Sequence, residues 1–504
     1  MGIPSYYKKL IDRFPALVKK VRAETPLKAD RLYMDFNCLI YYCLKSQPAY
    51  TEGSKAEWEK GLIEAVKKYT VHVWEVAGRP RHVFLGVDGV VPMAKIRQQR
   101  LRRFKSVWLA AAEREVGARV GESWDTNAIT PGTAFMEALG AGLRSLGEAR
   151  GWKVSDASEP GEGEQKLMAE IRREGSGRIV VYGLDADLIV LSLLGLAEKP
   201  VESWHLLREG GEFGAAADTF ATLDAGALLK ILVPTGLAAK DYVHDYICAM
   251  SFLGNDFLPH SLTVKIRDGG HDEMRKQLEQ LHVEGKRLVV DGVVQNTCAD
   301  FLESWAANEG QMLCSAIQHK YSMRPMVPRS DTERLMVGVQ NLPVEWKEDL
   351  CLFYRGALRS NWEEIYYSRW LRGADAPAVC AEYINGLQWI LDYYTGKPIS
   401  FSWYFPWNVP PLWSDLKVQI CDAVIAAAPV SAPVKPQEQL AMVLPQASWD
   451  LVRDLRLKGL PLAAPAFWPR TFSFFSAGRR WMWECEPEIP VMSVERMHVA
   501  LERL

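Results

Sequence analysis

The segment RIVVYGLDAD, residues 178–187, joins a short run rich in Val and Ile to two aspartates, Asp185 and Asp187. Its length and its β-branched side chains predict a buried strand over Arg178–Asp185. A strand that is apolar along its whole length is typical of a parallel sheet covered on both faces. The aspartates would then stand at the carboxyl end of the strand, where ligands bind in folds of this kind.

Two earlier runs have the same form, Arg31–Asp35 ending in YMD and His82–Asp88 ending in GVD. Amphipathic helical stretches lie between the runs, for example Lys55–Ala77 and Phe135–Glu148. This alternation predicts an α/β fold with a mostly parallel central sheet flanked by helices. Because the carboxyl ends of parallel strands share one edge, the terminal aspartates should converge in space.

Further carboxylates come in closely spaced pairs. Asp185 and Asp187 are two residues apart, so both would point to one side of an extended chain. Glu162 and Glu164 have the same spacing within PGEGE, whose glycines let the backbone bend closely around an ion. Asp256 lies in the turn-like segment GNDFLP. The candidate catalytic and metal-binding residues are Asp35, Asp88, Glu162, Glu164, Asp185, Asp187 and Asp256.

So many carboxylates can share one site only if cations neutralise them. Oxygen ligands select Mg²⁺ or Mn²⁺, and two such ions about 3.5–4 Å apart would serve the hydrolysis of a phosphodiester. For any single acid, a solvated surface residue or a helix cap is the alternative interpretation. The position of these aspartates at the ends of apolar runs favours the metal site.

A basic segment follows Asp88 closely: KIRQQRLRRFK, residues 95–105, carries six cations and no acid. Lys95, Gln99, Arg102 and Arg103 stand at i, i+4, i+7 and i+8, which places them on one face of a helix. We expect this face to look toward the acids and to bind the terminal phosphate of a nucleic-acid strand. A solvated basic face or a localisation signal is the alternative for such a run in isolation.

Composition sets limits on the function. The formal net charge is −2 and the sequence pI about 6.5, so any nucleic-acid binding must come from a local patch. Nine cysteines without a C-x-x-C pair indicate neither a zinc ribbon nor a disulfide framework. We expect no transmembrane helix and no secretory signal, and therefore an intracellular protein, in the cytoplasm rather than the nucleus.

Together these segments resemble the Xrn-type 5′→3′ exoribonuclease family, part of the superfamily of PIN-like and flap-endonuclease-like nucleases. The matching pieces in chain order are MGIPSYYKKL (1–10), YMDFN (33–37), VDGVVPMAKIRQQRLRRFKS (87–106), NAITPGTAFM (127–136), PGEGEQKLM (160–168), YGLDADLIVL (182–191), FLGNDFLPH (252–260), EYINGLQWILDYY (382–394), SFSWYFPW (400–407), KPQEQLAMVLP (435–445) and PEIPVMSVERM (487–497). They span nearly the whole chain, leaving mainly residues 266–340 unmatched.

The resemblance implies processive 5′→3′ degradation of single-stranded, 5′-monophosphorylated RNA to mononucleotides with two Mg²⁺ ions, for which Mn²⁺ may substitute. The family's metal ligands fall on the seven acids named above, and its 5′-phosphate pocket on the four residues of the basic face. Its base-stacking positions fall on Trp403 and Tyr41. Core packing is the alternative for Trp403 and the better interpretation for Trp389. The resemblance also implies that Met1–Leu10 lies by the entrance to the site.

Two departures from the family stand out. Histidine is usual where this chain has Tyr41, which keeps a π face but loses the ionisable ring. The chain also resembles a compact form without the long C-terminal extension of the cytoplasmic members. We expect a monomer that meets no membrane. A structure-specific 5′ flap DNA nuclease, which shares the acids, and an inactive RNA-binding scaffold are the alternatives.

The expected organisation has three segments. Residues 1–265 form the nuclease core with the acidic site and the phosphate pocket. Residues 266–345 form a variable helical connector, with a helix over Asp272–His282. Residues 346–504, dense in aromatics, complete the funnel to the active site, and Ala426–Pro436 within them is expected to be a loop.

Overall fold

The computed structural model describes residues 3–22, 24–210, 219–423, 425 and 429–503. A seven-stranded sheet organises the first half of the chain, in the order β1-β7-β6-β5-β2-β3-β4. Its strands are β1 (Val18–Arg22), β2 (Arg31–Asp35), β3 (His82–Gly86), β4 (Lys153–Ser155), β5 (Arg178–Tyr182), β6 (Ser203–Glu209) and β7 (Thr219–Asp224). The five strands from β6 to β4 are parallel, and β7 and β1 add an antiparallel edge. The predicted mostly parallel sheet is confirmed.

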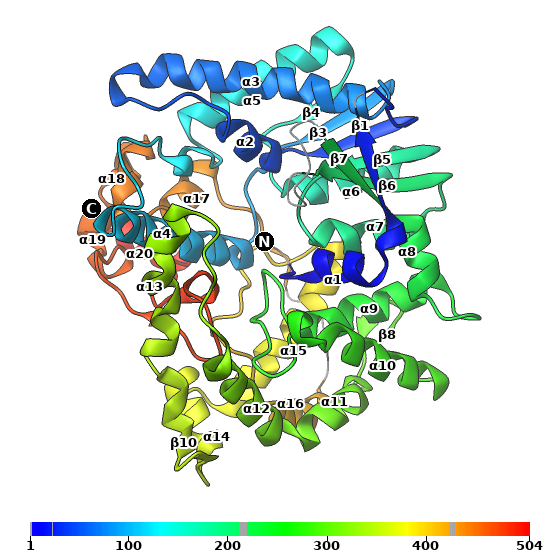
Figure 1. Cartoon of the computed structure of the whole chain (residues 1–504), viewed down its shortest axis with the longest axis vertical. Coiled ribbons are helices and arrows are strands. Elements are labelled where there is room, and N and C mark those ends of the chain that lie inside the picture. Colours follow the sequence, from blue (N-terminus) through cyan, green and yellow to red (C-terminus); the bar gives the residue numbers. More distant parts are fainter. Residues whose placement is uncertain (1–2, 23, 211–218, 424, 426–428, 504) are drawn as a thin grey trace.

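Helices cover both faces of this sheet (Figure 1). The helices of the first half of the chain are α1 (Tyr6–Arg13), α2 (Asn37–Leu44), α3 (Lys55–Val76), α4 (Met93–Glu115), α5 (Ala134–Arg150), α6 (Gly163–Glu174), α7 (Asp187–Glu198), α8 (Ala225–Leu232) and α9 (Ala239–Leu253). Alternate side chains of β2 serve the two layers: Leu32 and Met34 pack in the core with α3 and α5, and Tyr33 packs in the core with α6 and α7. This is why β2 is apolar on both sides.

The second half of the chain is mainly helical. It contains α10 (Gly270–Val283), α11 (Cys298–Ala307), α12 (Glu309–Ser322), α13 (Asp331–Glu345), α14 (Trp362–Ile365), α15 (Ala376–Thr395), α16 (Trp413–Asp422), α17 (Pro436–Val443), α18 (Leu455–Lys458), α19 (Leu460–Ala463) and α20 (Val494–Leu501). Short strand pairs are β8 (Val289–Val290) with β9 (Val293–Val294), β10 (Phe353–Tyr354) with β11 (Ala357–Leu358), and β12 (Phe474–Phe475) with β13 (Glu486–Pro487).

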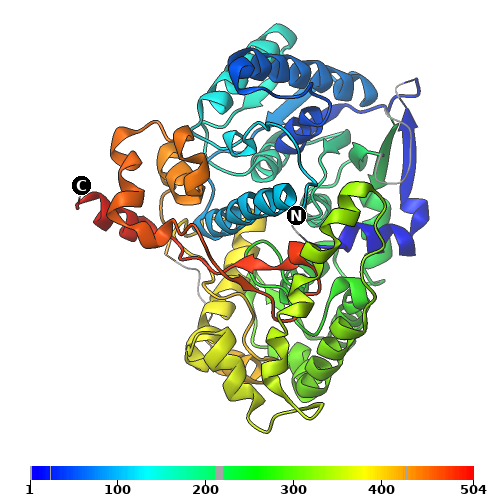
Figure 2. The ribbon, with the colours of Figure 1, turned by 60° about the vertical axis from the view of Figure 1, so that its left-hand side comes forward.

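This half does not fold apart from the sheet. One hydrophobic core runs from Ile3 through α7 and α9 to α15, α16 and Ala477. The long helix α4 lies in the middle of the molecule in Figure 2, and it packs against α17 and β13. Residues from both halves therefore surround α4. The proposed division at residues 265 and 345 stays a prediction.

Several expected elements are confirmed with small shifts. β3 and β5 end at Gly86 and Tyr182, so the backbone leaves the sheet before Asp88 and Asp185. The expected loop at 426–436 lies partly outside the described residues, and α17 begins at Pro436. All nine cysteines are free. Within the described ranges, no helix is both long and apolar enough to cross a bilayer.

Candidate active site

A cavity of about 270 Å³ opens at the carboxyl edge of β2, β3 and β5. Asp35 closes β2, while Asp88 and Asp185 follow β3 and β5 by two and three residues. Parallel strands bring these side chains to one place although they are far apart in sequence. Six of the seven predicted acids line the cavity: Asp35, Asp88, Glu162, Glu164, Asp185 and Asp256. We call this space the acidic cavity.

The predicted basic face lines the same cavity. Lys95, Gln99, Arg102 and Arg103 all border it from α4, as their helical spacing indicated. Pro92 sets the start of α4 and the helix runs uninterrupted to Glu115, so the spacing translates into one face. The guanidinium of Arg103 is buried and donates from Nη1 to Asn127 Oδ1 at 3.0 Å, which fixes its direction.

Close backbone approach positions the carboxylates at the start of α6. Glu162 is the residue before the first turn, and Gly163 N donates to Asp88 Oδ1 at 2.7 Å. A Cβ on Gly163 would lie 2.5 Å from Asp35 Oδ1 and 2.6 Å from Gly86 O. Only glycine lets the amino end of α6 come this near to β2 and β3.

Lys95 lies between two of the acids. Its Nζ is 2.5 Å from Glu162 Oε1 and 2.7 Å from Asp256 Oδ2. Burial opposes the charge of the ammonium, but Asp256 and Glu162 outweigh it and raise the pKa of Lys95 well above its ordinary range. Burial likewise opposes the charge of Asp256, and Lys95 outweighs it and lowers the pKa of Asp256 to about 2. The basic face thus already neutralises part of the acidic cluster.

The remaining carboxylates are crowded. Burial first, and then the charges of Asp88 and Asp185, raise the pKa of Asp35 well above its ordinary range. Burial and Asp187 do the same to the pKa of Glu164. Deprotonated carboxylates at these positions need more positive charge than Lys95 supplies. The cavity is therefore suited to cations.

The donor set fits divalent cations of the Mg²⁺ type. All candidate ligands are carboxylate oxygens, and within the described residues Oε1 of Glu164 and Oδ1 of Asp187 are buried without a hydrogen-bond partner. The acids are spread around the cavity: among the described residues no three His, Cys, Asp or Glu side chains are gathered closely enough to hold an ion as they stand.

One prediction about this site needs correction. Asp187 does not line the acidic cavity, because Ala186 has helical backbone angles and Asp187 begins α7. It is buried instead, and burial together with the charge of Asp256 raises its pKa to about 8. The expected extended arrangement of Asp185 and Asp187 is therefore wrong.

Trp403 is also absent from the lining of the acidic cavity. Its ring packs 5.1 Å from the ring of buried Trp389, and its Nε1 donates to Glu382 Oε2 at 3.1 Å. Trp389 is a core residue, as expected. Tyr41 does line the cavity, and 38% of its side chain is exposed.

Several residues that line the cavity or contact its acids were not predicted from the sequence. Asn37 donates from Nδ2 to Asp88 Oδ2 at 2.9 Å and accepts from Asp88 N at 3.2 Å, so it orients this acid. The hydroxyl of Tyr393, on α15, donates to Glu162. Asn37 could have been found as a polar residue two positions after a strand-end aspartate, whereas Tyr393 had no local signal. Cys38, Tyr42 and Lys45 also line the cavity.

Comparison with known proteins agrees with this geometry. Residues 1–210 match the family model described as the XRN 5′-3′ exonuclease N-terminus, and residues 360–504 match the model described as the Xrn1 helical domain. The chain belongs to the Xrn-type 5′-3′ exonuclease family. The first match contains most of the acids and the basic face, and the second contains Tyr393 and Trp403. The segments of the chain that match the two Xrn family models therefore meet around α4.

Curated relatives of this Xrn-type chain are named 5′-3′ exoribonucleases. The 5′-3′ exoribonuclease 2 of Arabidopsis thaliana is 26% identical over 99% of this chain and 66% of its own length. The 5′-3′ exoribonuclease 1 of Homo sapiens is 26% identical over 100% of this chain and 34% of its own length. The chain thus spans about one third to two thirds of these relatives. Among solved structures, the catalytic core of Rad2 in complex with DNA substrate is 15% identical with a TM-score of 0.35, covering 82% of this chain and 94% of that one.

Proposed function

We propose that this protein is a processive 5′→3′ exoribonuclease that degrades single-stranded, 5′-monophosphorylated RNA to mononucleotides. One observation carries the proposal: six carboxylates and the four residues of the basic face line a single cavity of about 270 Å³. A cavity of this size is at the small end of ligand pockets. A cavity of this kind would take one terminal nucleotide at a time.

The basic face would hold the terminal phosphate. Arg102 and Arg103 offer forked donors, Lys95 a point charge, and Gln99 an amide donor on the same face of α4. Arg103 is held in place by Asn127, so its orientation is set before substrate arrives. These donors suit the terminal oxygens of a 5′-monophosphate, and a bulkier cap or triphosphate would bind more weakly.

The carboxylates would hold two Mg²⁺ ions, with Mn²⁺ as a substitute. Bound there, such ions lower the pKa of a water and neutralise charge on the phosphodiester. Asp35, Asp88 and Asp185 stand at the sheet edge, Glu162 and Glu164 stand at the start of α6, and Asp256 stands in the loop after α9. Asp187, buried at the start of α7, would be the seventh metal ligand, because among the described residues its Oδ1 has no hydrogen-bond partner. Asn37 orients Asp88, and Tyr393 orients Glu162.

Tyr41 would stack against the terminal base, because its ring borders the cavity and remains partly exposed. Trp403, which packs against Trp389 and does not line the acidic cavity, would stack against a following base farther along the RNA. Pro4 and Ser5 border a neighbouring cavity that shares Arg102 and Asp256 with the acidic cavity. This supports a position of the N-terminal segment near the entrance. A monomeric state and a cytoplasmic location stay predictions.

The test is product analysis on 5′-monophosphate RNA labelled at either end, with Mg²⁺ or with EDTA. We expect mononucleotides from the labelled 5′ end, no products in EDTA, and slower decay of triphosphorylated RNA. Asp35→Asn with Asp185→Asn should lower the rate by at least about a hundredfold, because it removes charge that holds the cations. The matched control is Asp224→Asn, a strand-end aspartate of the same sheet that caps α8, a role asparagine also fills.

Three outcomes would count against the proposal. Full activity of the doubly substituted protein would remove the metal assignment. Equal rates on mono- and triphosphorylated RNA would remove the phosphate pocket. Preferred cleavage of a 5′-labelled DNA flap over RNA would favour the flap nuclease, and the absence of any product would favour the inactive scaffold.

A further inference from the structure

A second cavity, of about 400 Å³, lies against another face of α4. Arg97, Leu101 and Lys105 of α4 line it, together with the loop Gly254–Ser261 that follows α9 and the segment around β13. Arg102 and Asp256 border both this space and the acidic cavity. We call the second space the basic cavity. The two cavities are neighbours, separated by the side chains that they share.

The basic cavity has more positive than negative charge. Its lining includes the six cations Arg97, Arg102, Lys105, Lys265, Arg267 and Arg479, and the three carboxylates Asp256, Glu484 and Glu486. Glu484 is paired with Arg267, and Asp256 with Lys95, which belongs to the acidic cavity. Glu486 approaches Arg97 only to 4.0 Å. The lining is therefore left with uncompensated positive charge.

The two lysines of this lining are held by backbone carbonyls. Lys105 Nζ donates to the carbonyls of Trp483 and Cys485, each at 2.8 Å, and Lys265 Nζ to the carbonyl of Gly478 at 2.6 Å. Burial, with a contribution from Arg267, lowers the pKa of Lys265 to about 8. Buried cations without matching anions are costly, and a bound anion would offset that cost.

Arg479 is the clearest single indication of a ligand. It is 6% exposed and lines the basic cavity, and within the described part of the chain its Nε has no hydrogen-bond partner. Its Nη2 makes a long hydrogen bond to the carbonyl of Asn408, at 3.4 Å. Nε of Arg97, another lining residue, also has no partner among the described residues. Arg97 also donates from Nη2 to Asn408 Oδ1 at 2.6 Å, so of these two guanidinium groups the one of Arg479 is held more weakly by protein and is the one that a ligand in the cavity would bind.

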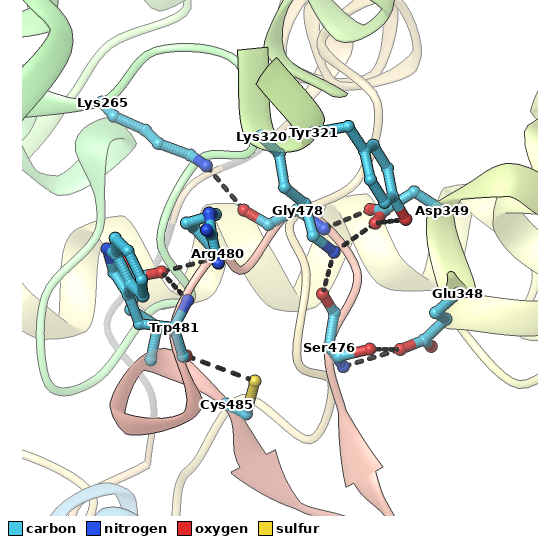
Figure 3. A network of polar contacts seen from close by, with 11 residues as sticks. Lys265, Lys320, Tyr321, Glu348, Asp349, Ser476, Gly478, Arg480, Trp481 and Cys485 are labelled. Carbon is cyan, nitrogen blue, oxygen red and sulfur yellow. Dashed lines mark hydrogen bonds and ion pairs between the residues drawn. The ribbon is translucent and has the colours of Figure 1, made fainter. Parts of the chain in front are cut away.

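A network of polar contacts holds the segment that carries Arg479 (Figure 3). Lys320 and Asp349 form a fully buried ion pair, and Lys320 Nζ also donates to the carbonyl of Ser476 at 3.1 Å. Asp349 accepts from Gly478 N, and Lys265 donates to the carbonyl of the same residue. The backbone on both sides of Ala477 is held, so Arg479 is placed by the fold rather than by solvent.

The volume and the remaining lining indicate what the ligand is. About 400 Å³ falls within the range of small-molecule pockets and is far larger than a water or a single ion needs. Phe257 and Leu258 supply apolar surface, and Trp483, 49% exposed, supplies an aromatic face at the rim. Cations beside an aromatic surface suit a phosphate joined to a base.

We propose that the basic cavity is a second binding site for a nucleoside 5′-monophosphate, with Arg97, Lys265 and Arg479 on the phosphate and Trp483 against the base. The link to turnover rests on the proposed exonuclease function, whose product this ligand would be. The cavity shares Arg102 and Asp256 with the acidic cavity, so a released mononucleotide would meet it directly. An occupied basic cavity would then slow release of the next product.

Equilibrium dialysis of radiolabelled 5′-AMP against the whole chain with Mg²⁺ tests the site without catalysis, because 5′-AMP has no phosphodiester bond to cleave. We expect two bound nucleotides per wild-type chain, one at each cavity. Arg479→Gln should remove the second by weakening it about tenfold to a hundredfold, the range for loss of a charge-assisted hydrogen bond. Arg480→Gln is the matched control: this neighbour is also buried, but it binds Asn341 and does not line the cavity.

Further variants assign each bound nucleotide to its cavity. Arg103→Gln should leave only the Arg479-dependent nucleotide, and the double variant Arg103→Gln, Arg479→Gln should bind none. If Arg479→Gln unfolds at a lower temperature than wild type, Arg479→Lys should retain the second nucleotide. Added 5′-AMP should inhibit wild-type and Arg480→Gln turnover more strongly than Arg479→Gln turnover, with single-turnover rates within about twofold.

Unchanged stoichiometry in Arg479→Gln and Arg97→Gln would overturn the proposal. Orthophosphate that binds the Arg479-dependent site as tightly as 5′-AMP would overturn its nucleoside part. A chain without nuclease activity that still binds two nucleotides would retain this site and remove the proposed function, so the two failures are distinguishable.

Discussion

Gly163→Ala tests whether the acidic cavity depends on the close approach of α6 to β2 and β3. The new Cβ would stand 2.5 Å from Asp35 Oδ1, about 0.9 Å inside the 3.4 Å at which ordinary contacts begin. It would also meet the backbone oxygen of Gly86 at 2.6 Å, which cannot rotate away. The helix must therefore shift by most of that distance, and Glu162, Glu164 and Asp88 move relative to Asp35.

The expected cost follows from this geometry. Overpacking of this size lowers the free energy of unfolding by about 1–3 kcal/mol. A displacement near 1 Å between groups that must act together lowers the rate of the chemical step about a hundredfold. Urea denaturation followed by tryptophan fluorescence measures the first, and single-turnover release of a 5′-labelled nucleotide measures the second.

Gly61→Ala is the matched control. Gly61 lies in α3 and is exposed, and a methyl group added to its Cα would meet no other atom within 4 Å. The same chemical change should there raise the free energy of unfolding by up to about 1 kcal/mol and leave the rate unchanged. Wild-type stability and activity in Gly163→Ala would refute the reasoning, because they would show that α6 can retreat without disturbing the carboxylates.

Two other predictions concern buried charge. Lys320→Met should lower the free energy of unfolding by about 3–5 kcal/mol in urea denaturation, because it leaves Asp349 buried without its ammonium partner. The double variant Lys320→Met, Asp349→Asn should recover part of this loss. Equal instability of the single and double variants would contradict the prediction. Burial raises the pKa of Glu309 to about 7, so between its ordinary value of 4.5 and 7 the folded state binds more protons than the unfolded state. The contribution of Glu309 to the free energy of unfolding should therefore fall as pH rises through that window. Glu309→Gln can still accept from Trp413 N, so the free energy of unfolding of this variant should rise relative to that of wild type from pH 5 to pH 7.5. A stability difference that is independent of pH would exclude this role.

The strands that carry the aspartates were predictable because their periodicity is local. β2, β3 and β5 are short apolar runs, and each ends in an acid or is followed by one within three residues. β1 was not predicted, because its sequence VKKVR is mostly polar and finds its place only by pairing with β7. Tertiary pairing decides such edge strands.

The parts of the site that lie within a single helix or strand could be predicted from the sequence. The spacing of Lys95, Gln99, Arg102 and Arg103 on α4 fixed their common face, and the structure places all four on the acidic cavity. The direction of Asp187 depended on the backbone angles of Ala186, which spacing does not reveal. The basic cavity could not be predicted, because its lining combines segments near residues 5, 100, 256, 266 and 480, and no local pattern shows that these segments meet.

The position of α4 between two cavities has a consequence for how its sequence can vary. Each residue of an α-helix advances about 100° around the axis. A single residue inserted or deleted between Lys95 and Arg102 would turn everything beyond it by that angle and carry Arg102 and Arg103 away from the carboxylates. A substitution in α4 therefore changes one side chain, whereas a change of its length reorients every later side chain that lines either cavity. We expect a substitution in this helix to affect only the contacts of the residue replaced, and a change of its length to impair both cavities.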